Sequence, residues 1–105
     1  MEKLPSQMLE SAKRRISLPQ NWCKGEQARD RQGRAVPYFS ARAEQFCMAG
    51  ALFREGQGFS SAWPFLNRAV GYKGVGFVND DSSTTHDDVL NIYDKAIALA
   101  KRSGK

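Results

Sequence analysis

The chain has 105 residues, a formal net charge of +5 and 41% hydrophobic residues. Two domains of this combined length would each be too small to bury a useful core without metals or disulfides, so we expect residues 1–105 to form a single domain. No apolar run approaches the roughly 20 residues that a membrane span needs, and residues 1–16 carry no apolar signal segment. We therefore expect a cytoplasmic protein with no membrane partner.

The charge is unevenly distributed along the chain. Residues 13–34 contain seven Lys or Arg and two acidic residues, whereas residues 80–94 contain five aspartates and no basic residue. Such polarity orients a molecule in the field of a charged partner, and it suits binding to nucleic acid or to an acidic protein surface. A solvated surface with no specific role is the alternative interpretation.

The first third of the chain predicts one helix followed by a hairpin. Apolar residues recur at helical spacing through residues 8–16, which indicates an amphipathic helix that ends before Pro19. Residues 21–39 lack a helical period and contain several turn-forming residues. We interpret them as a loop with a short hairpin over residues 28–36, turning at Gly33.

A second helix is predicted to begin at Ser40, whose hydroxyl can accept a hydrogen bond from a first-turn amide. Its inward stripe would consist of Ala43, Phe46, Cys47, Gly50 and Phe53, and Gly56 and Gly58 would end it. The small residues around Gly50 predict that another element approaches this helix closely.

A third helix is predicted over residues 60–72, capped by Ser60 or Ser61, with Pro64 tolerated in its first turn. Residues 74–78, GVGFV, predict a short buried strand. The last helix has the clearest pattern, because Thr85 and Asp88 match a capping box and apolar residues follow at spacings of three and four. Together the elements predict a mainly helical α+β fold of about four helices and a short β-hairpin in one compact domain.

The stretch from Phe77 to Leu90 combines aspartates with the only histidine, but it does not match a metal loop. Alternating oxygen side chains from Asp81 to Asp87 resemble a calcium loop without its glycine and its final glutamate. One histidine and two scattered cysteines also supply too few ligands for zinc. We expect no metal and no cofactor.

An enzyme is an alternative interpretation. Cys47 could act as nucleophile and His86 as its base, oriented by Asn79 or Asp80, in a cysteine hydrolase or transferase. The helical stripe that contains Cys47 predicts instead that the thiol points into the core, where it would be inert. We therefore name no catalytic residue, and Asn79 and Asp80 are expected to hydrogen-bond the turn that leads to the last helix.

Two features suggest binding to a macromolecule. The GYKG sequence of residues 71–74 matches the loop with which KH domains hold a nucleic-acid backbone, but that loop joins two helices, whereas the strand predicted after it argues against the match. In the basic region, arginines lie near Trp22, Tyr38 and Phe39, so cations and aromatic rings could together hold phosphates and bases. A core position covering the hairpin is the alternative for Trp22. The candidate binding residues are Arg14, Arg15, Trp22, Lys24, Arg29, Arg31 and Arg34.

The motifs NWCKGEQARDRQGRAV, FCMAGAL and FVNDDSSTTHDDVLNIYDKAIALA resemble, in that order, a domain-of-unknown-function family of small bacterial and phage proteins. The resemblance spans most of residues 20–100, and it departs from the family pattern at Phe77-Val78, where an aromatic residue would directly precede Asn79. It implies a phage or prophage context and no established activity.

We expect a small non-catalytic binding protein that attaches to a host protein, or to a protein–nucleic acid complex, and modulates or inhibits it. Nucleic-acid binding through residues 13–34 and a Cys47/His86 enzyme are the alternatives.

Overall fold

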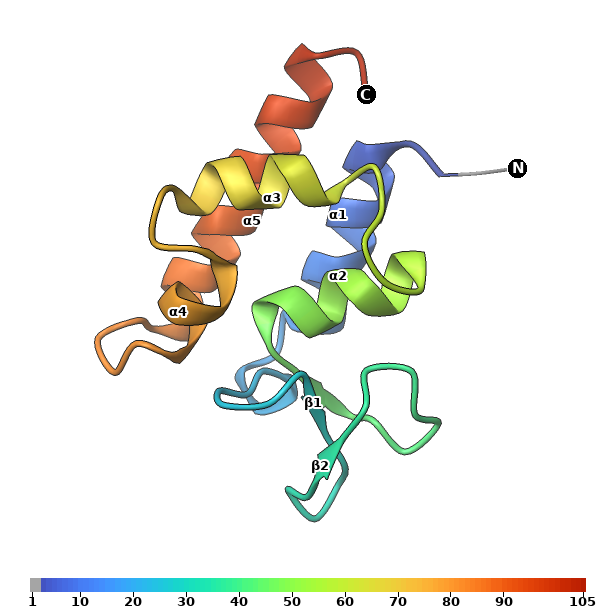
Figure 1. Cartoon of the computed structure of the whole chain (residues 1–105), viewed down its shortest axis with the longest axis vertical. Coiled ribbons are helices and arrows are strands. Elements are labelled where there is room, and N and C mark those ends of the chain that lie inside the picture. The colour runs from blue at the N-terminus through green and yellow to red at the C-terminus, as the bar shows by residue number, and fades with distance from the viewer. Residues whose placement is uncertain (1–2) are drawn as a thin grey trace.

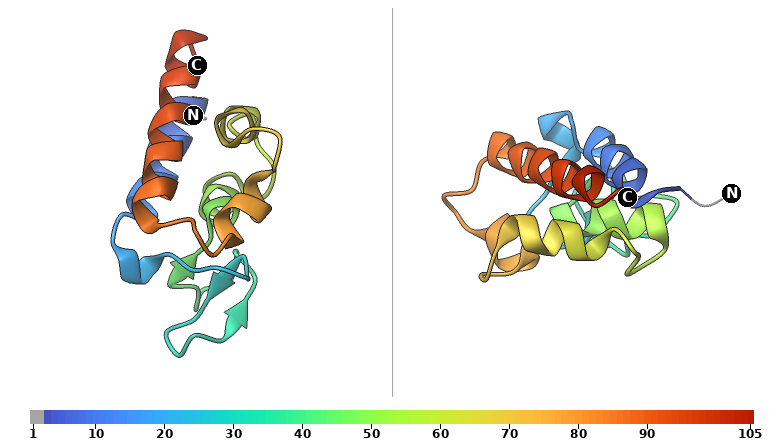
Figure 2. Two further views of the ribbon diagram at one scale, coloured as in Figure 1. Left: turned by 90° about the vertical axis from the view of Figure 1, so that its left-hand side faces the viewer. Right: turned by 90° about the horizontal axis from the view of Figure 1, so that it is seen from above.

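Two layers of helices lie above a small sheet in the computed structural model, which describes residues 3–105 (Figure 1). One layer contains α1 and α5, the other contains α2, α3 and α4, and the sheet lies below α2 (Figure 2). The elements are α1 (Pro5–Arg15), the 3-10 helix η1 (Pro19–Asn21), β1 (Ala28–Arg29), β2 (Ala35–Val36), β3 (Gln45–Phe46), α2 (Met48–Gly56), α3 (Trp63–Val70), α4 (Val75–Asp80) and α5 (His86–Arg102). This confirms the predicted mainly helical α+β fold, with one short helix more than expected.

The long helix α5 organises the core, and it begins where its sequence predicts. The Thr85 hydroxyl accepts a hydrogen bond from the Asp88 amide at 3.1 Å, and the Asp88 carboxylate accepts one from the Thr85 amide at 2.9 Å, which completes the capping box. Further along, Tyr93 is fully buried and its hydroxyl donates to the Met48 carbonyl at 2.6 Å. This bond ties α5 to the first turn of α2.

The sheet has three short antiparallel strands in the order β2-β1-β3. Ala28 pairs with Val36 on one side and with Phe46 on the other. The predicted hairpin over residues 28–36 is confirmed, and its turn places Gly33 at a φ of +82°, a conformation that glycine adopts without strain. The third strand was not predicted.

The predicted start of the second helix is wrong. Helix α2 begins at Met48, and the Ser40 hydroxyl accepts a hydrogen bond from the Arg42 amide within a local turn. The preceding Gln45–Phe46 is β3, and the Cys47 amide donates to the Gln27 carbonyl at 3.1 Å. Pairing with β1 provides hydrogen-bond partners for the backbone amides and carbonyls of these residues. A local sequence pattern cannot indicate such a long-range pairing.

The strand predicted over residues 74–78 is also wrong, because Val75–Asp80 forms helix α4. Its two buried side chains, Val75 and Asn79, are four residues apart, which is a helical and not an extended spacing. The GYKG loop therefore does join two helices, α3 and α4, contrary to the expectation from the sequence.

Neither serine caps α3 directly. The N-cap is Ala62, whose own amide donates to the Ser60 hydroxyl at 3.3 Å. Pro64 lies in the first turn as predicted. None of the helices in residues 3–105 combines the length and hydrophobicity that a bilayer span requires.

The close approach predicted at Gly50 is confirmed. A Cβ atom built there would lie 2.0 Å from the Gln27 carbonyl oxygen, because the loop before β1 crosses the first turn of α2. Gly76 in α4 is a matched contrast, since a Cβ atom there would meet nothing within 4 Å.

We expect Gly50→Ala to lower the free energy of unfolding by about 3 kcal/mol or more, because backbone must move to admit the methyl group. Gly76→Ala should leave stability unchanged or raise it by up to about 1 kcal/mol, since alanine favours a helix. Urea unfolding followed by circular dichroism measures both. Equal stability of the two variants would contradict the close approach.

Candidate functional site

Asn79, in the last turn of α4, holds three parts of the chain together. Its side chain is fully buried, and its Oδ1 accepts hydrogen bonds from the Trp22 indole at 2.7 Å and from the Met48 amide at 2.9 Å. Its Nδ2 donates to the Cys23 carbonyl at 3.1 Å and to Asp80 Oδ1 at 2.9 Å. The four hydrogen bonds use both ends of the carboxamide and join Asn79 to residues 22–23, to Met48 and to its neighbour Asp80.

The Asn79 side chain takes the place of a peptide group in an interrupted ladder. Trp22 and Phe46 form a parallel bridge, in which the Cys23 amide donates to the Phe46 carbonyl at 3.1 Å. A continuing parallel ladder would next join the Met48 amide to the Cys23 carbonyl. Here the Asn79 carboxamide lies between these two groups and bonds to each.

The residues beside Asn79 extend the same junction. Asp80 Oδ1 accepts a hydrogen bond from the Gly25 amide at 2.9 Å. The Lys24 ammonium donates to the Asp81 carbonyl at 2.5 Å and to the Thr84 carbonyl at 2.8 Å. The sequence predicts that Asn79 and Asp80 bond to the turn before α5, but both bond to the loop before β1. That turn is instead bonded by Lys24, which belongs to the same loop.

Cys47 and His86 serve separate structural contacts. Cys47 is buried and caps α2, where its sulfur accepts a hydrogen bond from the Gly50 amide at 3.2 Å. His86 Nε2 lies 2.6 Å from the Ile16 carbonyl oxygen, so this nitrogen carries a hydrogen, and its ring packs 5.8 Å from that of Trp22. Within residues 3–105 no hydrogen bond joins the thiol to the imidazole.

Burial also changes the acidity of both thiols. Removal from water raises the pKa of Cys23 to about 11 and raises the pKa of Cys47 above its usual value. The described part of the chain also brings no three His, Cys, Asp or Glu side chains into a cluster that could hold a metal ion.

Several predicted binding residues contact their own chain. Arg15 donates to Glu55 Oε2 from Nη2 at 2.6 Å and from Nε at 3.1 Å, and its guanidinium lies 5.4 Å from the Phe46 ring centroid. Arg29 donates to the carbonyls of Gly33 and Lys24 at 3.0 Å each. These arginines join α1 to α2 and brace the hairpin.

Three other predicted cations lie in two places, Arg14 on α1 and Arg31 and Arg34 in the hairpin. Arg34 donates to Asp30 Oδ2 at 2.8 Å, and the hydrogen bonds and charge of Arg34 outweigh burial and lower the pKa of that carboxyl. Arg14 is exposed on α1, and Arg31 is exposed at the hairpin turn. The structure therefore does not gather the seven predicted residues into one surface, and their contact with a partner stays a prediction.

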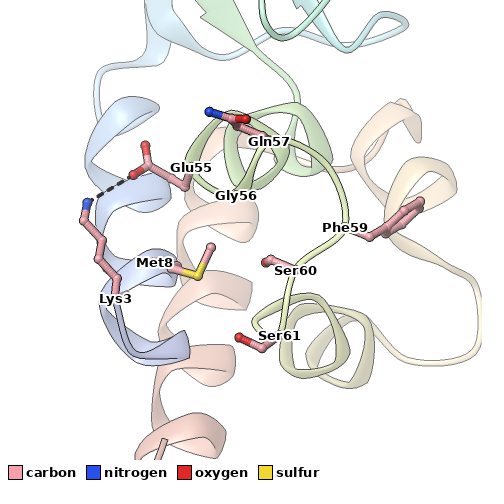
Figure 3. A pocket seen from close by; sticks show the side chains of 8 residues that line it. All are labelled: Lys3, Met8, Glu55, Gly56, Gln57, Phe59, Ser60 and Ser61. Atoms are coloured by element: carbon pink, nitrogen blue, oxygen red, sulfur yellow. Dashed lines mark hydrogen bonds and ion pairs between the residues drawn. The ribbon is translucent and has the colours of Figure 1, made fainter. Parts of the chain in front are cut away.

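A cavity of about 560 Å³ opens between α1, α2 and the loop that precedes α3 (Figure 3). The Glu55 carboxylate faces Lys3 at 3.5 Å there, and its other oxygen is held by Arg15. Burial alone would raise the pKa of Glu55, but the hydrogen bonds and charge of Arg15 outweigh it and keep that pKa below its usual value. The charges of this cavity thus largely neutralise one another, and they fasten α1 to α2.

The most distinctive surface of the protein is a continuous group of five aromatic rings, which we call the aromatic face. Adjacent ring centroids lie between 4.9 and 5.6 Å apart, and most pairs meet edge to face or tilted. The face consists of Tyr38, Phe39, Phe53, Phe59 and Trp63.

Two of these rings are largely in solvent. Phe39 is 68% exposed and Phe59 is 73% exposed. Phe59 reaches the face because Gln57 and Gly58 both have positive φ, +53° and +113°, and turn the chain sharply after α2. In Figure 3 its ring points away from Lys3 and Glu55.

Only part of the aromatic face was visible in the sequence. The sequence places Tyr38 and Phe39 beside the basic region, whereas Phe53, which is predicted to face inward, is only partly buried. The predicted elements do not identify Phe59, although its position within GQGFSS, a loop of small and polar residues, is the signal for an exposed ring.

Fold and surface together define a small helix-rich α+β protein with an exposed aromatic cluster and a buried polar junction. The chain belongs to a family of unknown function (DUF6197), whose sequence model matches residues 1–99. No curated protein matches the chain, and no solved structure matches it.

We expect Asn79→Asp to lower the free energy of unfolding by about 3 kcal/mol or more. The substitution keeps the size of the side chain but removes the donor to Cys23 and places a buried charge beside Asp80. Asn91→Asp is the control, because Asn91 is exposed on α5 and undergoes the same chemical change. Urea unfolding compares the two, and equal midpoints would contradict the role of Asn79.

The thiols should react slowly with a disulfide reagent in the folded protein. At pH 7 the raised pKa of Cys23 reduces its thiolate fraction about a hundredfold relative to the unfolded chain, and the rate should increase roughly tenfold per pH unit toward pH 10. Stopped-flow measurement of the reaction in the C23S and C47S variants, with and without urea, assigns a rate to each thiol in the folded and in the unfolded chain. A folded Cys47 that reacts as fast as the unfolded thiol would restore the cysteine-enzyme interpretation.

Proposed function

We propose that this chain is a non-catalytic binding protein that attaches to another protein through its aromatic face. The observation that carries the proposal is the continuous ring cluster with Phe39 and Phe59 mostly in solvent. A contiguous apolar patch of this kind on a small protein is typical of an interaction surface.

The energetics of association favour the same surface. Covering a large exposed apolar side chain contributes about 1.5 to 3 kcal/mol, and aromatic residues with arginine dominate the binding energy of protein interfaces. Because Phe39 and Phe59 already pack against Tyr38, Phe53 and Trp63, they lose less conformational freedom on binding than isolated surface side chains do.

The basic region supports this proposal in a reduced form. Because Arg15, Arg29 and Arg34 stabilise the fold, the basic region does not form a binding surface of its own. Arg31 and the neighbouring cations instead contribute positive charge around the aromatic face. Modulation of a host protein, a phage or prophage context and a cytoplasmic location belong to the same proposal, on the strength of the resemblance and of the charge distribution.

We expect the double variant Phe39→Ser/Phe59→Ser to lose its partner while it keeps its fold. The matched control is Tyr72→Ser/Phe77→Ser, which removes two rings that are 95% and 62% exposed outside the face. Tagged wild type, face variant and control are used to recover proteins from a lysate of the encoding organism, before and after nuclease treatment. Recovered species are quantified by mass spectrometry.

A protein that the wild type and the control recover about tenfold more than the face variant, with or without nuclease, supports the proposal. Equal recovery by all three contradicts it. Loss on nuclease treatment, with affinity that falls steeply as salt increases, would favour nucleic-acid binding instead.

A further inference from the structure

We infer that the partner segment bound by the aromatic face is acidic and apolar, with carboxylates that meet arginines at the edge of the face and aliphatic or aromatic side chains that cover Phe39 and Phe59. This inference rests on the proposed function and adds the chemistry of the partner. It is carried by the charges that surround the rings.

The segments that carry the five rings have positive charge available to a partner. Residues 37–43 and 53–63 contain Arg42, Arg54 and one acidic residue, Glu55. The Glu55 side chain is only 7% exposed and is held by Arg15, so it contributes little negative charge to the face. The free charge beside the rings is that of the two arginines.

Arg54 is fixed beside the rings and keeps donors free. Its Nη1 donates to the carbonyls of Tyr38 and Ser40 at 2.8 Å each, and the guanidinium lies 5.8 Å from the Phe46 ring centroid. Within residues 3–105 its Nε and Nη2 make no hydrogen bond. A preorganised guanidinium of this kind can bind a carboxylate with little loss of side-chain entropy.

The hollow beside Arg54 gives the partner a place to bind. A cavity of about 360 Å³ is lined by Tyr38, Phe39, Arg54 and Gln57. Its mixture of ring edges, one guanidinium and one carboxamide suits an apolar side chain flanked by a carboxylate.

Positive charge continues from the face toward the hairpin. A second hollow of about 330 Å³ is lined by Asp30, Arg31, Gln32, Arg34, Ala41, Arg42 and Glu44. Its arginines outnumber its carboxylates, and Asp30 is already held by Arg34. With Asp30 paired, Arg31 and Arg42 outnumber the remaining carboxylate, Glu44, so an acidic segment that crosses the face would meet a net positive charge there.

The rings favour a protein segment over single-stranded nucleic acid. Successive bases stack best on rings that lie parallel to one another, whereas Phe39 meets Tyr38 at 89° and Phe59 meets Trp63 at 84°, so each exposed ring stands nearly perpendicular to its neighbour. The GYKG loop, a second place where nucleic acid could bind, carries Lys73, and the Asp81 carboxylate attracts it: hydrogen bonds from Ser83 mainly lower the pKa of Asp81, and the charge of Lys73 lowers it further. That carboxylate would repel a phosphate.

The experiment is a selection of short random-sequence displayed peptides on the folded full chain, with counter-selection on Phe39→Ser/Phe59→Ser. We expect the enriched peptides to carry net negative charge and apolar residues. Enrichment of neutral or basic peptides that depend on the face would overturn the acidic partner and leave the proposed function standing. Failure to enrich any peptide that depends on the face would overturn both.

The strongest acidic peptide is then measured by fluorescence anisotropy against Arg42→Glu, with Lys95→Glu as control because both side chains are exposed and only Arg42 lies at the face. Reversal of the charge at position 42 should weaken peptide binding by about five- to tenfold, and reversal of the charge at position 95 should weaken it by less than about twofold. Equal effects of the two substitutions, or tighter binding of oligothymidylate than of the peptide at physiological salt, would overturn the inference.

Discussion

The carboxamide of Asn79 is the contact on which the arrangement of the other elements depends. It stands between two backbone segments, and it supplies a donor to one and an acceptor to the other. Since the group is buried, each of these bonds would be costly to lose, and water cannot easily replace them. The loop before β1, the start of α2 and the end of α4 therefore keep their relative positions through one side chain.

Electrostatic contacts in this protein mainly stabilise the fold. Lys24 bonds to carbonyls of the turn before α5, Arg15 joins α1 to α2 through Glu55, and Arg29 bonds within the hairpin. A run of basic residues in a sequence suggests a charged surface, but here many of these cations bond to groups of their own chain. The cations that remain free to contact another molecule are therefore fewer than the sequence suggests.

Local patterns were sufficient where local interactions decide the structure. The capping box at Thr85 and the turn at Gly33 are predicted because a short range of sequence determines them, whereas the small residue at Gly50 predicts a close approach without indicating that the Gln27 carbonyl makes it. The start of α2 was not predicted correctly, since Gln45 and Phe46 pair with a strand about 17 residues earlier. The strand predicted at the start of residues 75–80 was wrong for a different reason, because a short apolar run is compatible with either a strand or a helix.

The aromatic face could be predicted only in part, since it assembles rings from two separate stretches of the chain, residues 37–43 and 53–63. Helix α2 connects it to the rest of the molecule: its first turn bonds to Asn79, and Phe53 and Arg54 lie nearer its other end, about 8 Å away along the helix axis. The side chains that anchor α2 and the rings that lie in solvent are thus different residues. Proteins that share this scaffold can therefore replace the outer rings while their interior stays the same.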